Sequence, residues 1–105
     1  MPLWSIHDAW GWRTLDAEPL MAELRRFGSV SVLNGHIHQI VQKVEGQITF
    51  HTTRSTAYPQ PAPGVGPGPG PLKVPADRLA SVLGVSSVTL QRHPRQFALH
   101  DVSLA

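Results

Sequence analysis

The chain has 105 residues, a formal net charge of +2, no cysteine, 41% hydrophobic residues and 15% charged residues. This length predicts one domain with a small core, and the lack of cysteine excludes disulfides and thiolate metal sites. The scattered basic residues indicate no nucleic-acid surface, and no apolar run reaches the roughly 20 residues of a membrane span.

The segment 1–15 predicts irregular structure with an aromatic anchor. Trp4, Trp10 and Trp12 all lie within it, and we expect large aromatics to pack, although Trp10 and Trp12 could instead stack on a substrate. The charged fraction of the chain lies below the roughly 25% typical of soluble domains. Together these features favour a unit whose surface is partly covered by other chain. The start lacks a secretory-signal pattern, which leaves a cytoplasmic or a periplasmic location open.

A helix over 17–27 is predicted next, followed directly by a strand over 29–34. Asp16 is a plausible N-cap and Gly28 a plausible end. One apolar stripe at helical spacing supports the helix, with members Leu20, Met21, Leu24 and Phe27. The β-branched, alternating run "SVSVLN" supports the strand.

A hairpin follows, with arms over 40–44 and 47–53 and a turn at Glu45-Gly46. The segment 58–71, "YPQPAPGVGPGPGP", is nearly all proline and glycine, so it can form neither a helix nor a strand ladder. It predicts a long loop that either wraps the surface or serves as a linker. A third possibility is a docking ligand for a proline-recognising module.

The C-terminal part predicts a second helix over 75–83 and a second hairpin. Pro75 suits the helix start and Gly84 its end. The runs "VSSVTLQ" and "QFALHDVSL" are typical of strands, and "RHPR" joins them as a turn because proline disfavours a continuing strand.

His36 and His38 are the strongest chemical signal in the chain. They follow Asn34-Gly35 at the end of an apolar strand, where α/β proteins place ligands. Neutral imidazole is a common ligand of borderline metal ions, and a glycine allows a sharp turn close to a site. An isolated His-x-His also occurs on ordinary surface strands, so both interpretations stay open on the motif alone.

The block "VLNGHIHQ" resembles the strand followed by Gly-His-x-His of the calcineurin-like metallophosphoesterases. The stretches "PLWSIHDAWGW", "LRRFGSVSVLNGHIHQ" and "TFHTTRSTAYPQPAPGVGPGPGP" are similar to a bacterial branch of that family, so the resemblance covers nearly the whole chain. It implies an α/β fold with two packed sheets. It also implies hydrolysis of phosphate esters at a two-metal site holding Mn, Fe or Zn.

Carried over to this sequence, the resemblance makes His36 and His38 metal ligands, one for each ion, and makes Asn34 and Gly35 site-shaping residues. The family's Asp-x-His, Gly-Asp and Gly-Asn-His blocks do not occur in this chain. The expectation is therefore the C-terminal part of a metallophosphoesterase domain over 1–105. We expect it to be inactive alone and to depend on a complementing N-terminal half for binding its phosphate-ester substrate.

Several other residues have both a functional and an ordinary interpretation. His51 could support a metal ligand from the second shell or be an ordinary strand histidine. His7 and Asp8 could form an acid–base pair or be solvated, and Arg54 could face a phosphate or lie in solvent. His93 and His100 predict surface positions.

The alternative function is a non-catalytic module that binds metal through the histidine pair or binds a protein through the proline-rich loop.

Overall fold

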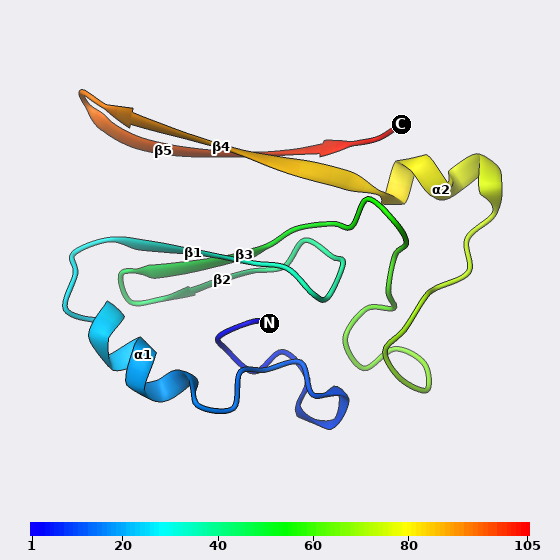
Figure 1. Cartoon of the computed structure of the whole chain (residues 1–105), viewed down its shortest axis with the longest axis horizontal. Coiled ribbons are helices and arrows are strands. Elements are labelled where there is room, and N and C mark those ends of the chain that lie inside the picture. The colour runs from blue at the N-terminus through cyan, green and yellow to red at the C-terminus, as the bar shows by residue number, and fades with distance from the viewer.

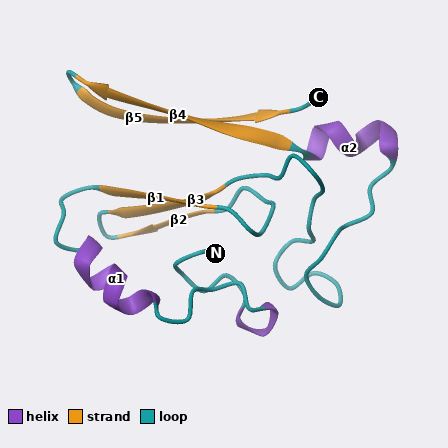
Figure 2. Cartoon of the chain, in the orientation of Figure 1, coloured by secondary structure: helices purple, strands orange, loops and turns teal.

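The computed structural model describes residues 1–105 and has two small sheets and two helices (Figures 1 and 2). The helices are α1 (Ala17–Leu24) and α2 (Ala76–Val82), with a short 3-10 turn, η1 (Asp8–Trp10), before them. The strands are β1 (Val30–Asn34), β2 (Gln42–Glu45), β3 (Ile48–Thr52), β4 (Gly84–Arg92) and β5 (Arg95–Ser103). The chain is thus a small α/β fold, as expected. No helix is long and apolar enough to cross a membrane.

The first sheet has the order β1-β3-β2, with β3 parallel to β1 and antiparallel to β2. The predicted hairpin is confirmed, with its turn one residue later than expected, at Gly46-Gln47. Gly46 has a φ of 58°, in the left-handed region that favours glycine. Because β1 and β3 are parallel neighbours, their carboxyl ends lie at the same edge of the sheet.

The core lies on one face of this sheet. The side chains of Phe50 and Ile48 both point to that face and are 0% and 1% exposed. They pack with Met21 of α1. The Trp4 ring lies 4.9 Å from the Phe50 ring, which confirms that this tryptophan packs. Successive strand residues point to opposite faces, so His51 emerges on the other face.

The first helix is shorter than predicted, because α1 ends at Leu24 and not at residue 27. The Arg25 carbonyl accepts a hydrogen bond of 2.7 Å from the Gln47 side chain, and its guanidinium lies against Glu18 and Glu45. Residue 25 thus contacts Glu45 and Gln47 beside the β2–β3 turn at the point where the helix ends. The predicted N-cap, Asp16, makes no capping hydrogen bond.

The second hairpin, β4–β5, is confirmed, and its two strands pair along their full length. Gly84 was expected to end α2, but it is the first residue of β4. A Cβ at this position would lie 2.5 Å from the Val102 carbonyl oxygen. The glycine is needed for close approach of two strands and not for ending the helix.

The chain is flat, with extents of 44 × 34 × 16 Å. Figure 1 shows the β4–β5 hairpin along one side of the first sheet, and α1 with the N-terminal segment along the other. The site described below lies between the first sheet and the hairpin.

Candidate functional site

A cavity of about 580 Å³ lies where β1 and β3 end and β4 begins. Its lining includes His36 and His38, which were singled out from the sequence, together with His51 and Arg54. The ends of parallel strands are where α/β sheets hold their ligands. Four candidate residues from two separate segments of the chain therefore meet in one place.

The histidine turn has an unusual backbone. His36 and His38 have φ angles of 80° and 60°, and a left-handed conformation costs a residue with a Cβ about 1–2 kcal/mol. Ile37 between them is fully buried and anchors the turn. Gly35 has no positive φ, and a Cβ there would meet nothing within 4 Å. The sharp turn is therefore made at the histidines, not at the glycine that was expected to make it.

Gln60 holds this turn from the proline-rich loop. Its Nε2 donates a 2.7 Å hydrogen bond to the His36 carbonyl, and its Oε1 accepts one of 3.0 Å from the Gly70 amide. The side chain is buried, and a buried polar group fixes its neighbours when all its bonds are made. Sequence patterns gave no signal for Gln60, because its partners lie 24 and 10 residues away.

His38 has one ring nitrogen bonded and no partner on the other. Its Nδ1 lies 2.8 Å from the Tyr58 carbonyl oxygen. A carbonyl only accepts, so in the neutral ring Nδ1 carries the proton and Nε2 keeps its lone pair. The Tyr58 ring also packs edge-on against the imidazole at 4.6 Å. This is the arrangement by which proteins fix the tautomer of a metal-binding histidine.

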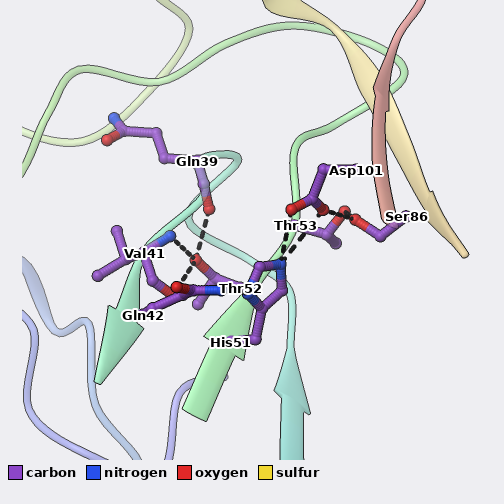
Figure 3. A network of polar contacts seen from close by, with 8 residues as sticks. All are labelled: Gln39, Val41, Gln42, His51, Thr52, Thr53, Ser86 and Asp101. Carbon is purple, nitrogen blue, oxygen red and sulfur yellow. Dashed lines mark hydrogen bonds and ion pairs between the residues drawn. The ribbon is translucent and has the colours of Figure 1, made fainter. Parts of the chain in front are cut away.

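His51 has both ring nitrogens occupied (Figure 3). Gln42 Nε2 lies 2.9 Å from Nδ1, and Asp101 Oδ2 lies 3.1 Å from Nε2. The side chain is only 4% exposed. No hydrogen bond joins it to His36 or His38, so the structure favours the ordinary strand histidine over the supporting role that was left open.

Asp101 is the centre of this polar network. Ser86 donates to its carboxylate, and Ser86 Oγ is itself 2.5 Å from Thr53 Oγ1. Burial raises the pKa of Asp101, but the hydrogen bonds from Ser86 and His51 and the charges of His51 and Arg54 outweigh it, and the pKa lies below the ordinary value of 3.8. The carboxylate is therefore ionised at neutral pH and joins β5 to β3.

The donor atoms are of a type that suits a divalent cation, but there are too few of them to hold one. Two imidazole nitrogens suit Zn²⁺, Mn²⁺ or Fe²⁺, but no three His, Asp or Glu side chains are close enough together to hold a metal ion. His51 has no free lone pair to add. The asparagine expected to shape the site, Asn34, ends β1 with its Nδ2 buried and unpartnered.

The remaining candidates have structural roles. His7 packs against Trp10 at 4.7 Å, and Asp8 contacts Ser5 and Arg13 and not His7. Trp12 is 1% exposed, as expected for a packing residue. His93 and His100 are exposed on the second hairpin, as predicted.

The proline-rich loop lies on the molecule and is not a free linker. Pro59 and Gln60 are buried, and the Pro59 carbonyl accepts a 2.8 Å hydrogen bond from the Leu72 amide. Gly64 approaches the His7 ring, where a Cβ would lie 3.4 Å from Nε2. The surface-hugging interpretation therefore holds.

Comparison with models of known protein families, with curated proteins and with solved structures gives no match to this chain. Its function is therefore inferred from its own residues and their geometry.

Proposed function

We propose that this chain is the C-terminal part of a metal-dependent phosphoesterase of the calcineurin-like type, within a two-sheet α/β sandwich. His36 and His38 are its metal ligands. The observation that carries the proposal is the setting of His38, whose Nδ1 is anchored on the Tyr58 carbonyl while its Nε2 is free. That setting lies in a cavity shared with His36.

The backbone of the turn supports the same proposal. Two left-handed histidines in three residues are costly, and such conformations cluster at functional sites. A turn with only a structural role would be more stable with glycine or asparagine at these positions. The sequence "NGHIHQ" resembles the family's metal-binding block and supplies the same two side chains.

The chain's own residues hold and orient the donors. Tyr58 fixes the His38 tautomer, Gln60 fixes the His36 backbone, and Asp101 holds the ring of His51, which lines the cavity. Bound divalent ions would supply charge stabilisation at phosphoryl oxygens. Because this chain offers two free donors, the remaining ligands come from a segment outside these 105 residues. Alone, the chain should bind metal weakly and hydrolyse no phosphate ester.

Calorimetric titration of Zn²⁺ and Mn²⁺ into the purified chain tests the proposal. The test variant is His36→Ala/His38→Ala, and the matched control is His93→Ala/His100→Ala, which removes two exposed histidines from the second hairpin. We expect saturable binding that persists in the control and disappears in the test variant. Binding that is equal in both variants, or absent from the wild type, would contradict the proposal.

A non-catalytic two-histidine metal module is the second candidate, favoured by the absence of a third donor. It predicts the same metal titration. It differs in needing no metal ligands from a segment outside these 105 residues. No specific contact favours the docking role of the proline-rich loop: Pro59 and Gln60 are buried, whereas Pro67, Pro69 and Pro71 are exposed.

A further inference from the structure

The cavity beside the histidine turn carries positive and neutral donors and no carboxylate. Arg54 is its one permanently charged lining residue, and serine and threonine hydroxyl groups also line the cavity. The ionised carboxylate of Asp101 is not itself part of the lining, although it is bonded to the lining residues Ser86 and His51 and its charge interacts with that of Arg54. The lining itself therefore offers an anion a guanidinium and hydroxyl donors.

The Arg54 guanidinium is largely unused. No carboxylate lies within 4.0 Å of it, in contrast to Arg13, Arg25 and Arg26, which all form ion pairs. Its single hydrogen bond is a long one, 3.4 Å from Nη1 to the Ser81 carbonyl oxygen. A guanidinium has five donors in a planar fork that matches the oxygens of a phosphate.

Ser55 next to it also has a free proton. Its Oγ accepts hydrogen bonds from the Ala57 amide at 2.9 Å and the Tyr58 amide at 3.4 Å. The oxygen therefore serves as an acceptor in this turn, and the hydroxyl hydrogen remains available to donate. Thr53, by contrast, is occupied by its contact with Ser86.

The cavity also has apolar lining residues. Leu33 of β1 and Val88 and Leu99 of the hairpin line it, and Leu33 and Val88 are 49% and 45% exposed. Half-exposed apolar side chains in a cavity gain free energy when a ligand covers them. The cavity lining thus combines one charged group and several hydroxyl groups with apolar side chains.

We propose that Arg54 and Ser55 bind the phosphoryl oxygens of a phosphate ester whose apolar organic group lies against Leu33, Val88 and Leu99. The choice of an ester rests on the proposed function. The anion contact itself stands on the free guanidinium and does not need a metal ion. Arg54 is therefore the residue by which this part of the chain recognises substrate.

NMR titration of the ¹⁵N-labelled full chain in metal-free buffer at constant ionic strength tests this proposal. The probes are inorganic phosphate and phenyl phosphate, followed at the backbone amides of residues 53–56 and at the Arg54 Nε–H. Arg54→Gln removes the fork, and Arg54→Lys keeps only the charge. Arg95→Gln is the matched control, because it removes the same charge at the tip of the second hairpin.

We expect saturable shifts at residues 53–56, weakened about 10- to 100-fold in Arg54→Gln and by an intermediate factor in Arg54→Lys. Arg95→Gln should leave the affinity unchanged, and phenyl phosphate should bind more tightly than phosphate. Shifts elsewhere, an equal loss in Arg95→Gln, or equal affinity for the two probes would overturn the proposal. The metal titration above can fail while phosphate binds, and the reverse, so the two proposals fail separately.

Discussion

Two histidines on the same cavity, His38 and His51, differ in what they have left to offer. His38 uses one nitrogen against a backbone carbonyl and keeps the other free. His51 uses both, against Gln42 and Asp101. Residue type therefore does not identify a ligand, whereas the accounting of donors and acceptors does.

The difference follows from where each residue lies in the fold. His51 is in β3, the central strand, and its ring is buried beneath the second hairpin. A buried imidazole needs partners at both nitrogens, and Asp101 and Gln42 supply them. His38 is on a turn after β1, where the proline-rich loop covers only one edge of the ring.

Removing each imidazole ring in turn tests the difference between His38 and His51. His38→Ala should weaken Zn²⁺ binding by about 100-fold or more, because the loss of a ligand should exceed the 10- to 100-fold loss that follows loss of an outer-shell partner. His51→Ala should leave Zn²⁺ affinity nearly unchanged. Calorimetric titration of both variants measures the effect, and an equal loss in the two would show that His51 is also a ligand.

Gln60, in the proline-rich loop, supports the turn that carries His36 and His38. Gln60→Ala removes the hydrogen bond to the His36 carbonyl and should lower Zn²⁺ affinity about tenfold, the size found for outer-shell partners. Gln96→Ala, an exposed glutamine on β5, is the control. Unchanged affinity in Gln60→Ala would mean that the turn holds its conformation without the loop.

Low pH should weaken the contact between His51 and Asp101, because acid protonates the Asp101 carboxylate. The pKa of Asp101 is lowered in the folded chain, because hydrogen bonds from Ser86 and His51 and the nearby charges of His51 and Arg54 outweigh its burial. A lowered carboxyl pKa contributes stability that is fully present above the unfolded value of 3.8 and is lost as the pH falls through the folded value.

Urea unfolding of the wild type and Asp101→Asn as the pH is lowered from about 5 toward 2 checks this expectation. The free energy of unfolding should fall more steeply with acid in the wild type. Parallel curves would show that Asp101 does not join the hairpin to the sheet in solution.

The smallest expected effect concerns the strain in the turn. His36→Gly should be more stable than His36→Ala by about 1 kcal/mol, since glycine adopts the left-handed conformation without the cost to a Cβ. Both variants should bind Zn²⁺ equally poorly. Thermal unfolding of the pair measures the difference, and a less stable glycine variant would show that the φ of His36 is not positive in solution.

Local patterns predicted the elements well. The apolar stripe predicted α1, although Leu20 and Phe27 of that stripe are exposed. Alternation predicted β1 and composition predicted the loop over 58–71, because each signal lies within a few neighbouring residues. The pairing of β1 with β3 and the contact between His51 and Asp101 could not be predicted, since the second spans 50 residues. Neither has a signature in sequence spacing.

The candidate site was predicted in part. His36 and His38 were expected from their place after a strand, and both lie in the cavity. The left-handed backbone of these two histidines was not expected, because glycine is the usual residue in that conformation and Gly35 stands immediately before them. The roles of Gln60 and Tyr58 depend on how the loop folds back, which composition alone does not specify.

The most direct test of the account is a ¹⁵N NMR spectrum of the imidazole nitrogens, recorded with and without Zn²⁺. We predict that His38 is protonated at Nδ1 and His51 at Nε2 in their neutral rings, and that Zn²⁺ shifts His38 Nε2 while the His51 signals stay in place. A His38 ring protonated at Nε2, or a Zn²⁺-induced shift at His51 alone, would contradict the assignment of His38 as the ligand and of His51 as part of the wall.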